Sequence, residues 1–189
     1  MPVSQNIQNF YRVAATKDFS RDFLFRVTDL KLDGLPALDE GSLIYAKAAQ
    51  LPARAITNVS VPYMGLPFNV PGNATYPGSD AYSLTFFLDQ NSDLRKYFEQ
   101  ASRVLFNDLT STGGYGTPYN DSYIELTQLS KSLDPLTKYR LFGASIRSIN
   151  AIDYSMSAGT GQTVDVQVTL AYHFYTQEEV ARVQEQLLD

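Results

Sequence analysis

The chain has 189 residues, of which 44% are hydrophobic and 19% are charged. This length and apolar content support one hydrophobic core, so we expect a single domain over residues 1–189. The chain contains no cysteine, which excludes disulfides, thiolate metal clusters and cysteine nucleophiles. A net charge of −5 disfavours a surface that grips nucleic acid, because such a surface needs clustered Lys and Arg.

The first residues, Met1 to Tyr11, lack the basic start and the apolar stretch of a secretory signal. No run approaches the roughly 18 apolar residues that a membrane-spanning helix needs. We therefore expect a protein that is made and used in solution, with no membrane partner. Residues 1–20 are expected to form an N-terminal arm ahead of the first strand.

Alternation of apolar and polar residues, the pattern of half-buried strands, begins near residue 22. It predicts strands over 22–32 and 42–50. Residues 53–61 lie between Pro52 and Pro62 and alternate weakly, which indicates an edge strand or an extended arm.

Residues 62–78 are crowded with proline and glycine, and we expect a long loop there. This loop carries the large apolar side chains of Tyr63, Met64 and Phe68. Loops seldom leave such side chains uncovered, so we expect another surface to cover them.

Strand periodicity returns over 81–89 and then changes to helical periodicity. After a cap at Asn91 or Ser92, apolar residues recur at spacings of three and four, which predicts one internal helix. A glycine-rich link over 112–120 lacks the Lys and the Ser or Thr of a phosphate-binding loop, so we interpret it as a hinge. The apolar stripe of the helix consists of Leu94, Tyr97, Phe98, Ala101, Val104 and Leu105.

Two further strands are expected over 122–129 and 139–152, ahead of the most regular alternation in the chain. Six apolar residues there fall on every second position and predict one strand over 163–175. At about 3.4 Å per residue this strand would be roughly 40 Å long, and its edge must pair with something. The six residues are Val164, Val166, Val168, Leu170, Tyr172 and Phe174.

The end of the chain carries Thr176 and Glu179 at the spacing of a capping box, which predicts a C-terminal helix over 176–188. The predicted fold is therefore mainly β: a β-sandwich or barrel of two packed antiparallel sheets, with one flanking α-helix and the C-terminal helix. A long strand edge can be covered within a monomer, or by a ring of copies that continues the sheet between subunits.

No set of residues has the spacing of a catalytic centre, so we expect no enzyme activity, no cofactor and no metal. The only histidine, His173, lies on the polar face of the expected long strand, with no cysteine nearby to share a metal. Carboxylates could pair for glycoside hydrolysis, but nothing in the sequence places two at the required separation, and we interpret them as solvated charges. They are Asp121, Glu125, Asp134, Asp153 and Asp165.

Several short elements occur in a distinctive order between Leu43 and Gln100. A Lys-Ala strand end precedes a Leu-Pro pair, a Val-Pro-x-x-Gly turn, and an aromatic strand that leads into a helix. These elements, with the opening segment SRDFLFRVTDL and the closing segment TVDVQVTLAY, resemble the tail tube proteins of contractile-tailed bacteriophages and the related inner tubes of type VI secretion systems. The residues are Lys47, Ala48, Leu51, Pro52, Val61, Pro62, Gly65, Phe68, Asn69, Val70, Gly72, Arg95 and Phe98.

The resemblance implies a structural virion protein that forms hexameric rings, which stack into a hollow tube inside a contractile sheath and conduct DNA during ejection. The implied partners are other copies of the chain, the tail sheath protein, the tape measure protein, the baseplate and tail terminator proteins, and double-stranded DNA in transient, non-specific passage. The implied location is the phage tail of the virion, with assembly in the host cytoplasm.

In proteins of this kind an arm between the early strands reaches the next ring. The resemblance places this arm at about residues 53–70, where Tyr63, Met64, Leu66 and Phe68 would supply the apolar contact. The alternative is a loop that folds back on its own core.

A conduit for DNA should avoid rings of Lys or Arg, which would hold the phosphate backbone. Acidic and neutral polar residues repel DNA weakly and leave it free to slide. We therefore expect the polar faces of the barrel strands to line the lumen. The candidates are Asp165, Gln167, Thr169, Glu125 and Thr127.

Other functions stay open at this point. The chain could be the tube initiator at the baseplate junction of the same particle, or the inner tube of a related contractile injection or type VI secretion system. From a different class, a β-barrel of this size could bind a small ligand in its interior. Only the tube hypotheses predict six-fold rings or hollow filaments.

Overall fold

The computed structural model describes residues 7–16, 19–32, 34–114, 121–155 and 161–180. Its helices are α1 (Ile7–Thr16), α2 (Glu40–Leu43) and α3 (Asp93–Leu105). Its strands are β1 (Phe25–Lys31), β2 (Ala46–Ala49), β3 (Ala55–Tyr63), β4 (Leu66–Thr75), β5 (Tyr82–Phe87), β6 (Phe106–Asn107), β7 (Thr112–Gly113), β8 (Tyr123–Leu129), β9 (Pro135–Phe142), β10 (Ser145–Ile149), β11 (Asp165–Ala171) and β12 (Phe174–Glu179).

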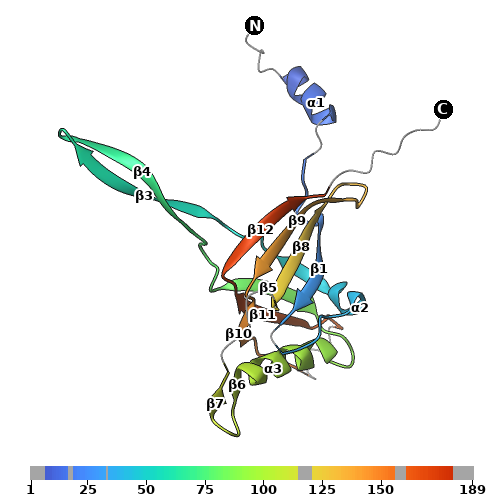
Figure 1. Ribbon diagram of the computed structural model, residues 1–189. Coiled ribbons are helices and arrows are strands. Elements are labelled where there is room, and N and C mark those ends of the chain that lie inside the picture. Colours follow the sequence, from blue (N-terminus) through green and yellow to red (C-terminus); the bar gives the residue numbers. More distant parts are fainter. Residues whose placement is uncertain (1–6, 17–18, 33, 115–120, 156–160, 181–189) are drawn as a thin grey trace.

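Two four-stranded antiparallel sheets form the body of the molecule (Figure 1). Sheet A has the strand order β1-β8-β9-β12, and sheet B has the order β10-β11-β5-β2. The prediction of a mainly β fold with two packed antiparallel sheets and a flanking helix is confirmed. Of the two architectures predicted, the described strands form the sandwich, because the two sheets keep separate edges.

The core lies between the two sheets and is closed at one end by α3. Side chains alternate along each strand, so every second residue of β5 and β11 is buried. Helix α3 adds Leu94, Phe98 and Ala101, and the Phe98 ring lies 5.6 Å from that of Phe86. Sheet A contributes Val27, Leu30, Ile124, Leu126 and Leu141, and sheet B contributes Tyr82, Leu84, Phe86, Ile146, Val166, Val168 and Leu170.

Helix α3 begins where predicted, but its cap differs from the prediction. Ser92 has a positive φ of 57° and caps no backbone group with its side chain. The carboxylate of Asp89 instead accepts hydrogen bonds from the backbone N–H groups of Asp93 (3.0 Å) and Leu94 (3.3 Å). Burial raises the pKa of Asp89, but these backbone hydrogen bonds together lower it below its ordinary value.

The single long strand predicted over 163–175 is wrong, because the chain changes sheets within it. β11 ends in sheet B, and β12 begins in sheet A. At the crossing, the N–H of Tyr172 donates to the Ser79 carbonyl (2.8 Å) and that of His173 donates to the Phe142 carbonyl (2.9 Å). The bend at His173 also reverses the alternation, so Tyr175 and not Phe174 packs against the core.

The helix predicted to begin at Thr176 is also wrong. Residues 174–179 pair with β9 as a strand, with Thr176 opposite Arg140 and Glu179 opposite Thr137. A capping box is a short local signal, and sheet pairing along the whole segment outweighs it. The rest of the predicted helix, residues 181–188, lies outside the described residues.

Three other expectations are corrected. The stretch predicted as a loop over 62–78 is largely strand β4, paired with β3. The strand predicted over 42–50 is preceded by the short helix α2. The strand predicted over 139–152 is divided at Gly143, which has a positive φ of 70° and lies against the His173 ring.

Candidate assembly interface

The hairpin of β3 and β4, which we call the arm, projects away from the sandwich (Figure 1). It continues the neighbouring strands β2 and β5 of sheet B and ends in a two-residue turn. Met64 and Gly65, the central residues of that turn, both have positive φ values, 48° and 79°. This conformation is a type I′ turn, whose twist matches that of the flanking strands. The chain therefore reverses tightly and presents Met64 at the tip, where it is 86% exposed.

The outer part of one face of the arm, from Val59 to the turn, is apolar. Cross-strand partners lie on the same face of a hairpin, and three apolar pairs follow one another along this one. The opposite face carries the pairs Ser60–Asn69 and Pro62–Pro67. All six apolar side chains are exposed. They form the pairs Val59–Val70, Val61–Phe68 and Tyr63–Leu66, which together we call the arm face.

The base of the arm is held by the body. The buried hydroxyl of Tyr82 donates to the carbonyl of Gln50, just after β2 and ahead of β3, over 2.7 Å. Burial raises the pKa of Tyr82, so this donor keeps its proton throughout the ordinary pH range. Beyond this base the arm has no second layer, and a two-stranded hairpin is at best marginally stable alone. The arm face therefore indicates a surface that another molecule covers.

The predicted inter-ring contact residues lie together on this element. Tyr63, Leu66 and Phe68 share the arm face, and the rings of Tyr63 and Phe68 lie 6.4 Å apart. Met64 occupies the tip. Sequence reasoning missed Val59, Val61 and Val70 as parts of the same surface, although their alternation was visible on either side of the prolines. Which molecule this surface contacts stays a prediction.

Three of the predicted lumen residues lie on the outer face of sheet B. Asp165, Gln167 and Thr169 alternate with buried valines and leucine along β11. The Asp165 carboxylate pairs with the ammonium of Lys47, which leaves little net charge at that position. Gln167 donates to Ser83 Oγ (2.9 Å) and accepts from Asn150 Nδ2 (2.7 Å). At these three positions along β11 the face is polar and nearly neutral.

The other two lumen candidates lie on sheet A. Glu125 accepts hydrogen bonds from Thr28 Oγ1 (2.9 Å) and Lys138 Nζ (3.2 Å). Thr127 is only 1% exposed, and its hydroxyl lies 3.1 Å from that of Thr28. The burial of Thr127 therefore does not support a position on the lumen wall. The structure thus divides the five candidates between the outer faces of two different sheets.

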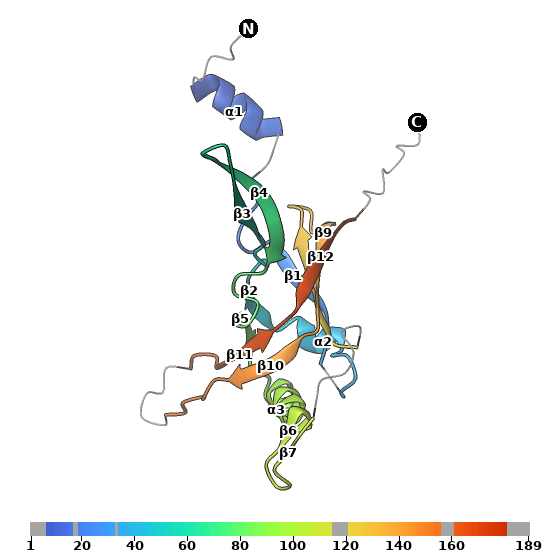
Figure 2. The ribbon, with the colours of Figure 1, turned by 60° about the vertical axis from the view of Figure 1, so that its left-hand side comes forward.

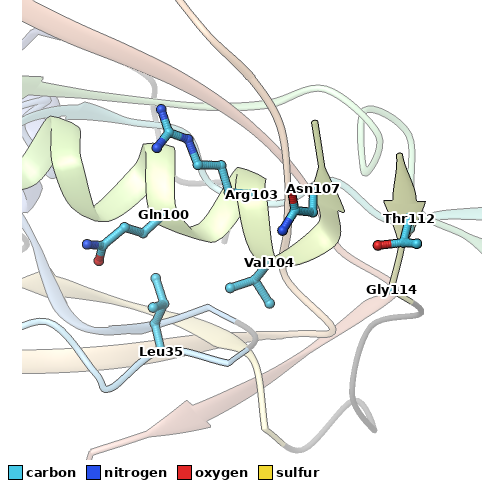
Figure 3. Close-up of a pocket in the computed structure, with 8 residues that line it drawn as sticks. Leu35, Gln100, Arg103, Val104, Asn107, Thr112 and Gly114 are labelled. Carbon is cyan, nitrogen blue, oxygen red and sulfur yellow. The ribbon is translucent and has the colours of Figure 1, made fainter. Parts of the chain in front are cut away.

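An open groove lies at the end of the molecule that carries α3, β6 and β7. Its volume is about 610 Å³, and Figure 3 shows the side chains that line it. Among the described residues, no group of three His, Cys, Asp or Glu side chains could hold a metal ion. Within the same residues, no helix is long and apolar enough to cross a membrane. The groove is lined by Leu35, Gln100, Arg103, Val104, Asn107, Thr112, Gly113 and Gly114.

Comparison with solved structures shows the same fold in components of contractile injection particles. A chain of the anti-feeding prophage baseplate has a TM-score of 0.58 and 14% identity, over 87% of this chain and 99% of that one. A chain of the anti-feeding prophage tube-terminating cap has a TM-score of 0.58 and 11% identity, over 87% and 93%. A chain of an extracellular contractile injection system (PVC) sheath-tube complex has a TM-score of 0.54 and 11% identity, over 89% and 97%.

The relationship to a family rests on sequence and not on these distant structures. No curated protein matches the chain. The model of the phage tail tube protein family matches residues 6–178, which include helices α1, α2 and α3, the arm and both sheets except the last residue of β12. The chain therefore belongs to the phage tail tube protein family.

Proposed function

We propose that copies of this chain form hexameric rings, that the rings stack into the hollow inner tube of a contractile phage tail, and that the tube conducts DNA without chemistry of its own. The observation that carries this proposal is the exposed arm face on a member of the phage tail tube protein family. A monomer would leave six apolar side chains in water. A polymer covers them and gains about 1.5–3 kcal/mol for each one fully buried.

The sandwich has edges from which a ring can be built. Sheet B ends at β2 on one side and at β10 on the other, and both strands are short. Unpaired N–H and C=O groups on such edges favour pairing with another strand. A head-to-tail contact between different edges of neighbouring copies closes into a ring, and a second contact along the axis extends it. The arm is the element that we assign to the axial contact.

The outer face of sheet B is our candidate for the lumen wall. Asp165, Gln167 and Thr169 lie there, and the Lys47–Asp165 pair cancels its own charge. DNA carries about one negative charge per 1.7 Å of axis, so these nearly neutral polar positions of β11 do not trap it. Sheet A, with Glu125 and Thr127, then faces away from the bore toward the sheath. The tape measure, baseplate and terminator proteins are proposed as partners at the bore and at the ends of the tube.

Electron microscopy of the purified full-length protein tests the proposal. Six-fold rings, or hollow filaments at high concentration, are expected. A protein that stays monomeric at high concentration and low salt contradicts the proposal. The same result would favour the ligand-binding hypothesis, although the space between the sheets is already filled by the core side chains.

A related inner tube is the second candidate, because the structural neighbours are chains of the anti-feeding prophage and of an extracellular contractile injection system. Their low identity to this chain establishes a shared fold only. Antibody labelling of intact particles separates the possibilities. Label along the whole tail supports the tube, whereas label at the baseplate junction alone supports the tube initiator. Label on particles that contain no DNA supports an injection system.

A further inference from the structure

Helix α1 carries an apolar face that is largely exposed in the described structure. At 3.6 residues per turn, Ile7, Phe10, Tyr11 and Ala14 fall on one side of the helix. Ile7 is 74% exposed, and Phe10 and Tyr11 are also exposed, although Phe10 stacks on Phe19 at 6.1 Å. A helix of 10 residues is too short to be stable by propensity alone. It therefore needs an apolar partner.

The groove of α3, β6 and β7 contains apolar side chains that could cover the apolar face of α1. Its lining includes the apolar side chains of Leu35 and Val104, which lie below α3 in Figure 3, and also Arg103, whose guanidinium extends away from them. Val104 is half exposed, and Leu109, between β6 and β7, is 97% exposed. The apolar groups of Leu35 and Val104 suit aromatic side chains, which bury a large apolar area on contact.

Helix and groove lie at opposite ends of the molecule. In Figures 1 and 2, which differ by a rotation about the vertical, α1 stands above the sandwich while α3, β6 and β7 lie below it. They cannot meet within one copy. Copies stacked head to tail along this direction, however, bring the α1 of one copy to the groove of the next.

We infer that α1 of each copy docks by its apolar face into the α3–β6–β7 groove of a second copy in the adjacent ring. This inference rests on the proposed tube, and it adds an axial contact that is separate from the arm. The arm is a poorer occupant of the groove, because its tip extends far to one side in Figure 1, whereas α1 and α3 lie nearly on one vertical line in both views. Tyr11 and Phe10 would pack against Leu35 and Val104.

Disulfide trapping tests the contact directly, because the chain has no cysteine of its own. Two single-cysteine variants, Ile7→Cys and Val104→Cys, are assembled as a mixture and oxidised. A cross-linked dimer of one copy of each is expected, and it can form only between copies. The control uses Gln8→Cys in place of Ile7→Cys, because Gln8 lies on the polar side of α1. A disulfide needs Cα atoms within about 7 Å, so the control is expected to give no cross-link.

A charge-matched pair tests the energetic role of α1. Ile7→Asp removes one apolar side chain from the contact and is expected to raise the concentration needed for filaments at least tenfold. Rings should still form. Gln8→Asp places the same charge in the same helical turn and is expected to leave assembly unchanged. Circular dichroism and thermal melting confirm that both variants keep the fold.

Two results would overturn the inference while the proposed tube stands: equal cross-linking of the Gln8→Cys control, or filaments of Ile7→Asp at the wild-type concentration. If wild-type protein forms neither rings nor filaments, the proposed tube itself fails, and the docking contact fails with it.

Discussion

The strand pairs β5–β11 and β3–β4 are built from the same kind of sequence but end in opposite environments. Both are antiparallel, and both place apolar side chains on one face in cross-strand pairs, such as Phe86–Val166 in the first and Val61–Phe68 in the second. Phe86 is fully buried, whereas Phe68 is 52% exposed. The difference lies in what covers each pair. Sheet A and α3 cover β5–β11, and the described chain provides nothing over the arm face.

The comparison teaches that apolar alternation specifies which side of a strand is buried but not which molecule buries it. In β5–β11 the burial stabilises the monomer, because the covering elements belong to the same chain. In the arm, burial of the apolar side chains requires a second molecule. Their burial therefore contributes to the free energy of association and not to that of folding. Substitutions in the two pairs should therefore affect different measurements.

The largest effect is expected in the arm. Changing Tyr63→Ser and Met64→Ser together removes two apolar side chains from the contact surface. Each is worth about 1.5–3 kcal/mol when buried, so the concentration needed for assembly should rise at least about a hundredfold. Thermal melting of the monomer should change little, since both side chains are exposed. Electron microscopy and analytical ultracentrifugation measure the loss of polymer.

Ser60→Ala with Asn69→Ala is the matched control for the arm, because this cross-strand pair lies on the opposite face. We expect the control to assemble normally and the Tyr63–Met64 variant to fail to assemble. Normal tubes from the Tyr63–Met64 variant would refute the assignment of the arm to the contact between rings.

The second effect is expected in the core. Phe86→Ala should lower the free energy of unfolding by about 3–5 kcal/mol, because it leaves a cavity against Phe98. Urea denaturation of the unassembled protein measures this change. The neighbouring Phe87 lies on the opposite face of β5, where Lys47 Nζ is 5.1 Å from its ring. Phe87→Ala should therefore cost much less, and equal losses at the two positions would contradict the burial difference.

The third effect is expected at the start of α3. Asp89→Ala removes the acceptor for the N–H groups of Asp93 and Leu94 and should cost about 1 kcal/mol. Asp89→Asn keeps a side-chain oxygen and should cost less. Because the folded pKa of Asp89 is below its ordinary value, the ionised cap stabilises the fold at neutral pH, and this contribution is lost as the pH falls through the folded pKa. Denaturation of wild type and Asp89→Asn from pH 7 downward should converge in acid; parallel curves would contradict this.

The elements that sequence patterns predicted best are those that local periodicity fully specifies. The stripe from Leu94 to Leu105 repeats at helical spacing, and β5 alternates without interruption, so both formed as expected. The sandwich follows from several such strands around one core. The change of sheet at His173 could not be predicted, because the sequence alternates on both sides of it and only the pairing of β11 with β5 and of β12 with β9 reveals the crossing.

The arm was hidden by its prolines, which made β4 resemble a loop. Both strands of an isolated hairpin are edges, so a proline is tolerated wherever its missing N–H would point away from the partner strand. Pro62 and Pro67 stand opposite each other, next to the Tyr63–Leu66 pair that flanks the turn. At a pair in the position of Pro62 and Pro67 the backbone N–H groups point away from the partner strand, so proline removes no hydrogen bond of the hairpin. Three residues of the arm face, Tyr63, Leu66 and Phe68, were singled out from the sequence, and their role in a contact between rings stays a prediction. What covers the arm face could not be predicted, because the described chain itself does not cover it.

The smallest effect on the fold is expected at Asp165, which tests the proposed lumen. Asp165→Lys breaks an exposed ion pair with Lys47, and such pairs are worth about 0–1 kcal/mol, so folding and tube assembly should persist. In the tube, the change adds a ring of positive charge along the bore, which should retain DNA and slow its ejection more at low salt than at high salt. Asp153→Lys makes the same charge change outside the strands of sheet B and serves as the control. Ejection at the wild-type rate from Asp165→Lys particles would remove Asp165 from the lumen and, with it, the orientation of sheet B toward the bore.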